Sequence, residues 1–168
     1  MKTKLIKGLF FLLVFVMFGC SKEANTTTPV ETVKTKVKIT GFKVENIPFV
    51  APDGLGWDGV SGLPDVYCGL FNGNSTLVVT SNVSDNVAQS SLPLTVTFNI
   101  PYQVPFFSDT INIVVMDSDQ NNTPVTDDDE IGYVPFVLND YTTGADKYPT
   151  TKTKTANGVT VTLFLTWE

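Results

Sequence analysis

The sequence predicts an all-β fold, an antiparallel Greek-key β-sandwich of seven or eight strands. Apolar residues recur at every second position in Leu92–Ile100 and again in Val159–Trp167, as half-buried strands of antiparallel sheets require. Other segments rich in β-branched and aromatic residues are separated by Gly, Pro, Asn or Asp, and no stretch carries an amphipathic helix of useful length. Short strands at this spacing over about 135 residues are typical of a sandwich.

The elements follow from the same pattern along the chain. The expected strands are Thr35–Val44, Val66–Phe71, Thr76–Thr80, Leu92–Ile100, Thr110–Met116, Ile131–Leu138 and Val159–Trp167. The apolar phase of the first strand shifts at Gly41, which predicts a β-bulge there. Asn72-Gly73-Asn74 predicts a tight hairpin. Cys68 lies in an apolar run, which indicates a buried thiol and no disulfide framework.

Residues 1–20 have the pattern of a secretory signal sequence. A basic start is followed by the apolar run Leu9–Phe18, which is shorter than the ~20 residues of a membrane-spanning helix. The run ends Met17-Phe18-Gly19-Cys20, which resembles the bacterial lipobox, in which the Cys is acylated and becomes the first mature residue. We therefore expect a lipoprotein of the bacterial envelope, with the outer membrane favoured because Ser21 is not Asp. An ordinary secretory signal with an incidental Cys is the alternative.

Cleavage before Cys20 leaves a tether and one domain. Residues 21–32 are Thr-rich and lack hydrophobic periodicity, so we expect a flexible tether, and residues 33–168 form the domain. Removal of residues 1–19 changes the formal net charge from −6 to −9, because it removes Lys and no acid.

Two residue types are missing from the composition. The sequence contains no His, which excludes Ser-His-Asp and Cys-His catalysis and imidazole-ligated zinc. All basic residues are Lys, so no Arg can form a bidentate contact with phosphate or guanine, which argues against nucleic-acid binding. We expect a protein that is not an enzyme.

Acidic residues gather in two segments between strands. Of the 17 acids, nine lie in Asp53–Asp65 and Asp117–Glu130. Asp117 and Asp119 follow a strand directly, so in extended chain they share a face about 6–7 Å apart. Carboxylates at this density repel one another unless they are solvated or share a hard cation, and calcium accepts six to eight oxygens in a tolerant geometry. The sequence therefore predicts a Ca²⁺ site, with turn chemistry and no ligand as the alternative.

The second acidic segment also matches part of the helix-loop-helix calcium motif. Asp117, Asp119, Asn121 and Asp128 fall at its first, third, fifth and twelfth positions, but Asn122 replaces the turn Gly. A strand precedes the segment where that motif needs a helix, so we discount this interpretation.

A longer match covers the whole of residues 33–168. The first strand is followed by Asn46-Ile47-Pro48, Trp57-Asp58-Gly59 and Leu63-Pro64-Asp65-Val66-Tyr67, and later by Met116-Asp117-Ser118-Asp119 and Asp129-Glu130-Ile131-Gly132. In order and character these segments resemble a C2 domain, the eight-stranded sandwich whose loops at one end bind calcium.

The resemblance implies a ligand set from two loops. It assigns the first-loop ligands to Asp58 and Asp65 and the third-loop ligands to Asp117, Asp119 and Asp129, with carbonyl ligands at Trp57 and Ser118. Spacings depart from the family pattern, so Asp53 is a possible substitute for Asp58, and Asp127 or Asp128 for Asp129. Residues Asn82–Ser91 would form the second loop, where Asp85 or Asn86 would add an oxygen.

These features predict a non-enzymatic, calcium-dependent binding module anchored by lipid at Cys20. Its partner would carry phosphate, carboxylate or glycan oxygens. The alternative is a surface glycan-binding lipoprotein with structural calcium or none, in which Trp57 and Tyr102 contact the ligand. For Trp57, packing onto the edge of the sandwich is the competing interpretation. A passive assembly component without a ligand is a third.

Overall fold

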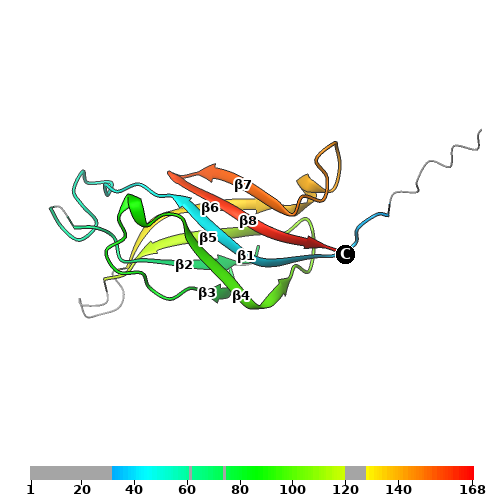
Figure 1. The fold of residues 1–168 in the computed structure, drawn as a ribbon, viewed down its shortest axis with the longest axis horizontal. Helices are drawn as coiled ribbons and strands as arrows, with labels where there is room; N and C mark the ends of the chain where they lie inside the picture. The colour runs from blue at the N-terminus through cyan, green and yellow to red at the C-terminus, as the bar shows by residue number, and fades with distance from the viewer. Residues whose placement is uncertain (1–31, 61, 74, 120–127) are drawn as a thin grey trace, which may run out of the picture. The chain divides into compact units, whose positions relative to one another are not determined.

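The computed structural model describes residues 32–60, 62–73, 75–119 and 128–168 (Figure 1). Within these ranges lie eight strands and two short 3₁₀ turns, η1 (Gln89–Ser91) and η2 (Leu138–Tyr141). The strands are β1 (Val37–Asn46), β2 (Val66–Phe71), β3 (Leu77–Thr80), β4 (Leu94–Gln103), β5 (Thr110–Asp117), β6 (Asp129–Val137), β7 (Thr151–Ala156) and β8 (Val159–Trp167). No helix within the described ranges has the length and apolar character to cross a membrane. Cys20, the signal sequence and the tether through residue 31 lie outside the described residues, and their assignment stays a prediction.

The strands form two four-stranded sheets, in the orders β4-β1-β8-β7 and β3-β2-β5-β6. Neighbouring strands in both sheets pair in the antiparallel direction. This arrangement confirms the predicted all-β, eight-stranded antiparallel sandwich. Strand β7 was not among the expected strands because Thr and Lys alternate in it, so it carries no apolar period. Its position at the edge of a sheet, where neither face is fully covered, explains why that sequence is tolerated.

The core fills the space between the sheets. Its members alternate along the inner strands and are almost completely buried; among them are Val37, Ile39, Phe42, Val44, Leu70, Ile111, Ile113, Val115, Val161 and Leu163. The register of β1 against both neighbours shifts between Ile39 and Gly41, which confirms the predicted bulge. Cys68 is a buried free thiol, as predicted.

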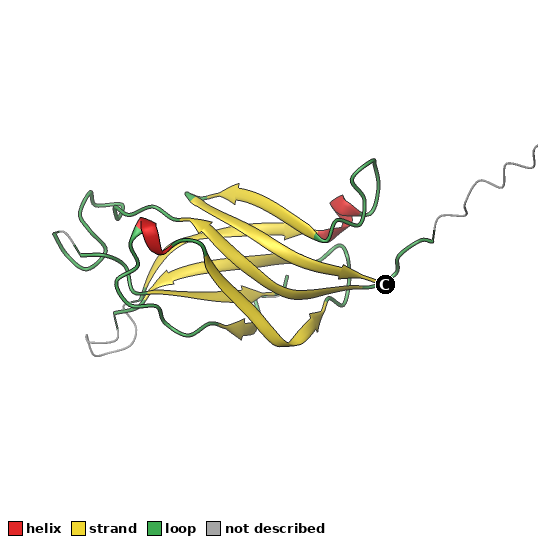
Figure 2. Cartoon of the chain, viewed as in Figure 1, coloured by secondary structure: helices red, strands yellow, loops and turns green. Residues whose placement is uncertain are grey.

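Three connections meet at one end of the sandwich, which we call the loop end (Figure 2). They are residues 47–65 between β1 and β2, residues 81–93 between β3 and β4, and the ends of the β5–β6 connection. Backbone hydrogen bonds join them: the N–H groups of Val66 and Ser118 donate to the carbonyls of Ser84 and Asp65 at 2.9 and 2.8 Å. The β2–β3 hairpin lies at the other end, since Gly73 neighbours Thr110 at the start of β5.

Candidate metal centre

Three of the predicted ligands form a compact cluster at the loop end. Asp58, Asp117 and Asp119 each offer one carboxylate oxygen, and these oxygens lie within 4.8 Å of one another. Asp117 is the last residue of β5 and Asp119 lies two residues further, while Asp58 comes from the β1–β2 connection. Gly62 allows Asp58 to approach, because a Cβ at position 62 would lie 2.2 Å from the Asp58 Cβ. We call these three residues the carboxylate cluster.

Asp117 is the buried member of the cluster, with 0% of its surface exposed. Its Oδ1 accepts a hydrogen bond of 2.6 Å from the Asp65 N–H. Its Oδ2 is buried and finds no hydrogen-bond partner among the described residues. Burial raises the pKa of Asp117 to about 6; the Asp65 N–H opposes that shift, and the carboxylates of Asp58, Asp119 and Asp65 add to it. The pKa of Asp58 is also raised, by desolvation first and then by Asp65 and Asp119.

Asp65, at the end of the β1–β2 connection, is hydrogen-bonded to both of the other connections at the loop end. Its Oδ1 accepts from the Asn86 N–H at 2.6 Å, and its carbonyl accepts from the Ser118 N–H at 2.8 Å. Asp65 therefore positions the cluster as well as adding negative charge beside it. The second connection contributes here through the Asn86 N–H, and the ligand oxygen that the resemblance implied at Asp85 or Asn86 stays a prediction.

In the third connection, Asp128 rather than Asp129 faces Asp119. Asp128 Oδ1 accepts from the Asp119 N–H at 3.1 Å, and Oδ2 accepts from the Tyr67 hydroxyl at 2.8 Å. Asp129 is exposed and begins strand β6, opposite Asp117 in the ladder. Neither Asp128 nor Asp129 belongs to the carboxylate cluster, and Asp127 lies outside the described residues, so which of the three would bind an ion stays a prediction. Sequence reasoning missed Tyr67, whose pKa is raised to about 12 by burial and by its hydrogen bond to Asp128.

Two other predicted residues of the first connection lie outside the carboxylate cluster. Asp53 is exposed, and its Oδ1 accepts from the Leu55 N–H at 2.9 Å, which is turn chemistry. The side chain of Trp57 belongs to the core, with 8% exposed, and its Nε1 donates to the Pro48 carbonyl at 2.9 Å. Burial with a satisfied indole N–H corresponds to the packing interpretation.

Comparisons with known proteins bear on the fold. No protein-family model matches the chain, and no curated protein matches it. Among solved structures the chain is similar to one described as "Structure of a C2 domain", with a TM-score of 0.51, 16% sequence identity, and coverage of 79% of this chain and 97% of that one. The fold is C2-like. This similarity confirms the C2-like sandwich that the sequence motifs predicted and, at this identity, concerns the fold alone.

The C2-like fold accounts for the meeting of acids that are far apart in sequence. Antiparallel pairing of β2 with β5 sets Val66 opposite Asp117, so the residues flanking these strands converge at one end of the sheet. The carboxylate cluster is thus a consequence of strand register, and the donors it presents are all oxygens.

Proposed function

We propose that this protein is a non-enzymatic, calcium-dependent binding module held on the bacterial envelope by a lipid at Cys20. The observation that carries the proposal is Asp117 Oδ2, a buried carboxylate oxygen with no hydrogen-bond partner among the described residues. A buried carboxylate oxygen without a partner is costly, and a bound cation removes that cost. C2-like domains also usually act as binding modules.

The donor set favours calcium over other cations. The residues that would hold the ion are Asp58, Asp117 and Asp119, all hard oxygen donors, and the sequence has no imidazole to favour a transition metal. Calcium takes six to eight oxygens in a flexible geometry, whereas magnesium demands a near-ideal octahedron. Two carboxylates from loops and one from the end of β5, with one of the three exposed, suit the more tolerant ion.

The protein's own residues would prepare the site in two ways. Asp65 links the three connections through hydrogen bonds. The Tyr67 hydroxyl donates to Asp128, which in turn accepts from the Asp119 N–H. Because exposed Asp58 completes a cluster whose other members are partly or fully buried, a bound ion would remain open to one further ligand. That ligand would be an oxygen of a phosphate, carboxylate or glycan on the partner.

A calcium titration tests the proposal. We expect the melting temperature of the purified protein to rise in millimolar calcium, since extracellular sites of this kind bind at about 10⁻⁴–10⁻³ M. A hundredfold excess over Kd stabilises the folded state by about 2.7 kcal/mol. Asp117→Asn should abolish the rise, whereas the matched control Asp53→Asn, in the same connection as Asp58, should keep it. A melting temperature that calcium leaves unchanged would overturn the proposal.

The anchor needs a separate test because it rests on the sequence of residues 1–20. We expect an alkyne-labelled fatty acid supplied to expressing bacteria to label the protein and co-fractionate with it in the outer membrane. Cys20→Ser should remove both the label and the membrane association. Unlabelled parent protein in the soluble fraction would support the ordinary secretory signal instead.

A further inference from the structure

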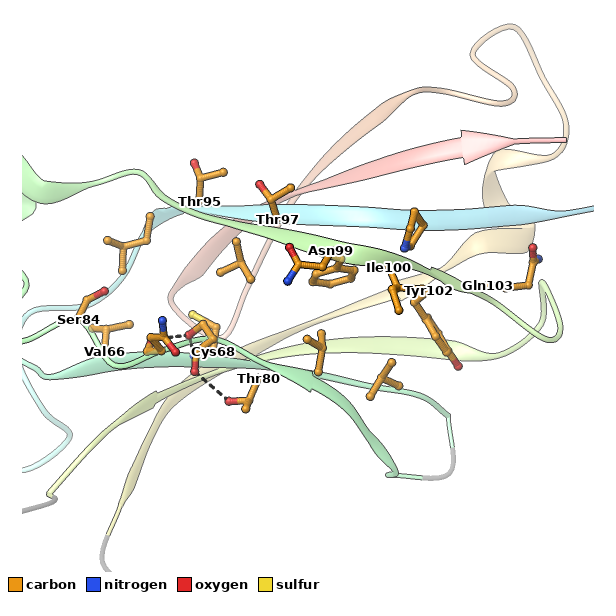
Figure 3. Close-up of a pocket in the computed structure, with 18 residues that line it drawn as sticks. Val66, Cys68, Thr80, Ser84, Thr95, Thr97, Asn99, Ile100, Tyr102 and Gln103 are labelled. Carbon is orange, nitrogen blue, oxygen red and sulfur yellow. Dashed lines mark hydrogen bonds between the residues drawn. The ribbon is translucent and has the colours of Figure 1, made fainter.

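A cleft of about 890 Å³ opens along one side of the sandwich, between the edge strands β3 and β4 (Figure 3). These strands end different sheets, so no ladder joins them and the layers separate there. The volume lies within the range of about 300–1,000 Å³ that is usual for small-ligand sites. None of the three residues of the carboxylate cluster lines this cleft.

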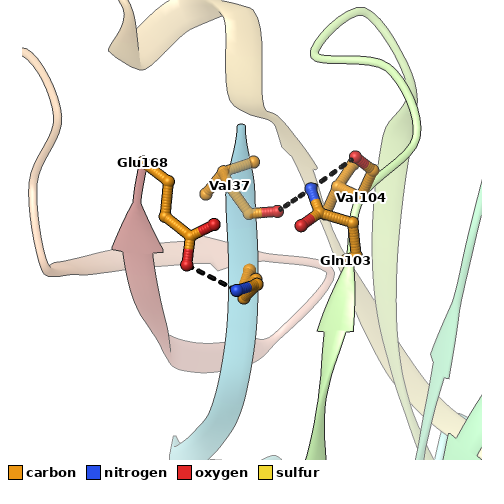
Figure 4. Close-up of polar contacts among 5 residues, drawn as sticks. Val37, Gln103, Val104 and Glu168 are labelled. Carbon is orange, nitrogen blue, oxygen red and sulfur yellow. Dashed lines mark hydrogen bonds and ion pairs between the residues drawn. The ribbon is translucent and has the colours of Figure 1, made fainter. Parts of the chain in front are cut away.

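An irregularity in β4 shapes the cleft. Thr97 pairs with Gly41, and Tyr102 pairs with Ile39. Between these two pairs β4 advances by five residues, whereas β1 advances by two. The extra residues bend β4, and Ile100 is left 85% exposed. Regular pairing resumes at the end of β4, where the Gln103 side-chain amide donates to the carbonyls of Val37 and Val104 at 3.1 and 3.4 Å (Figure 4).

The lining of the cleft carries no charge. Its 18 residues are Val66, Cys68, Val78, Val79, Thr80, Ser81, Asn82, Ser84, Leu94, Thr95, Val96, Thr97, Phe98, Asn99, Ile100, Pro101, Tyr102 and Gln103. Asp, Glu and Lys make up 17% of the chain, and none of them is present here. Half of the lining side chains carry a hydroxyl or an amide, and the others are apolar.

Some of these polar groups are available to a ligand. The side chains of Ser84, Asn99 and Tyr102 make no hydrogen bond to any residue that the structure describes. In Figure 3 the Ile100 and Tyr102 side chains point from β4 toward the space above β3, and Thr95 and Thr97 point to the other side of β4. The cleft therefore combines uncharged donors and acceptors with apolar side chains and two aromatic rings, those of Phe98 and Tyr102.

We propose that this cleft binds a segment of a neutral oligosaccharide. Sugar hydroxyls both donate and accept, as the amide of Asn99 and the hydroxyls of Ser84 and Tyr102 do. The apolar faces of sugar rings can pack against the apolar side chains that line the cleft. A charged ligand would lose hydration without gaining a partner charge. The proposal does not depend on calcium.

An extended peptide that adds a strand to β4 is the competing occupant. Strand addition needs an uninterrupted row of backbone donors and acceptors. The irregularity between Thr97 and Tyr102 interrupts the row, and Pro101 has no N–H to donate. Recognition by side chains, and hence of a glycan, is favoured.

Affinity electrophoresis tests the proposal with the whole protein. Native gels would contain starch, mannan, dextran or xylan as neutral probes, or alginate as an anionic probe, with and without a calcium chelator. We expect at least one neutral polysaccharide to retard the protein in both conditions and alginate to have no effect. Retardation lost only with the chelator would assign binding to the carboxylate cluster and overturn the proposal.

Variants locate the binding. Asn99→Ala and Tyr102→Phe, which keeps the ring, should each weaken binding about fivefold through one lost hydrogen bond. Thr80→Asp adds a charge at an exposed lining position and should abolish binding. Thr151→Ala, on the exposed edge strand β7, is the matched control and should bind as the parent does.

Three further results would overturn the proposal. They are no retardation by any neutral polysaccharide, retardation that all the cleft variants retain, and equal retardation by alginate. A peptide mixture that shifts the amide resonances of β3 and β4, when no polysaccharide does, would assign the cleft to strand addition instead.

Discussion

The Asp65 N–H donates to Asp117 Oδ1 across 2.6 Å, although the two residues are 52 positions apart in sequence. The bond lies at the end of the β2–β5 ladder, where Val66 pairs with Asp117. It holds one oxygen of a fully buried carboxylate and leaves the other without a partner among the described residues. The strand register thus creates both the stabilising contact and the electrostatic cost.

Replacing Asp117 by Asn should stabilise the calcium-free protein. The amide oxygen can still accept from the Asp65 N–H, while the amide N–H groups can donate to the carboxylates of Asp58 or Asp119. We expect a gain of about 1 kcal/mol, the net value of a satisfied buried hydrogen bond. Urea denaturation in the presence of a chelator measures it. A less stable Asn variant would show that the carboxylate is already satisfied.

The calcium-free protein should become more stable as the pH falls from 7 toward about 5. The pKa of Asp117 is raised from its ordinary 3.8 to about 6, so the folded state binds its proton before the unfolded state does. The stability that this proton gives is fully present below 3.8 and is lost as the pH rises through about 6. Glu45 and Glu168 have lowered pKa values and act in the opposite direction, but only below the ordinary 4.5 of Glu.

Thermal melts across this pH range, without calcium, measure the effect. The slope should be smaller in Asp117→Asn, which has no proton to bind at that position. A small slope should remain from Asp58, whose pKa is raised in the same direction. Equal slopes in parent and variant would mean that another group is responsible.

Tyr67→Phe should weaken calcium binding without removing a ligand. The Tyr67 hydroxyl donates to Asp128 Oδ2, and Asp128 Oδ1 accepts from the Asp119 N–H, so the phenol positions the third connection through Asp128. Loss of one hydrogen bond to a charged group should lower the affinity about threefold to tenfold. Calorimetric titration measures it, with Tyr133→Phe as the control because that ring is 40% exposed on β6. Unchanged affinity would show that Asp128 needs no support from β2.

Much of the fold follows from period-two apolar patterns, and the exceptions have physical causes. The pattern identified seven of the eight described strands, and it failed at β7 because Thr and Lys alternate there on a poorly covered edge. The divergence of β4 from β1 between Thr97 and Tyr102 depends on pairing between distant segments, so no local pattern signals it. The cleft that results was therefore not predictable.

The site was predictable where strand geometry decides it. Asp117 and Asp119 lie two residues apart after an alternating strand, so a shared face follows from the pleat. That Asp128 rather than Asp129 contacts the Asp119 backbone depends on where β6 begins and on the distant Tyr67 hydroxyl. The direction of Trp57 depends on the Pro48 carbonyl, which lies 2.9 Å from its Nε1. Neither contact has a sequence signal of its own.

Gly41→Ala should destabilise the sandwich at the start of the β4 irregularity. A Cβ at position 41 would lie 2.4 Å from the Val96 carbonyl oxygen and 3.2 Å from the Thr97 Cα, both backbone atoms of β4. The strands would have to separate, at a cost of about 1–3 kcal/mol. Gly73→Ala, where the nearest atom is 3.4 Å away, is the control and should be nearly neutral in chemical denaturation. Equal effects of the two substitutions would show that β4 moves freely.

Thiol labelling should distinguish the two cysteines. Cys68 is 1% exposed, and burial raises its pKa to about 12 against the opposing effect of Ser81, so at pH 8 the folded protein should not react with a disulfide reagent. If Cys20 is acylated as proposed, the denatured mature protein should react at one thiol per chain, since an acylated Cys20 offers none. A Cys68→Ala variant should then react at no thiol. Two reactive thiols per denatured parent chain would show that Cys20 is present and carries no lipid, and rapid labelling of the folded protein would show that the β2 core opens readily.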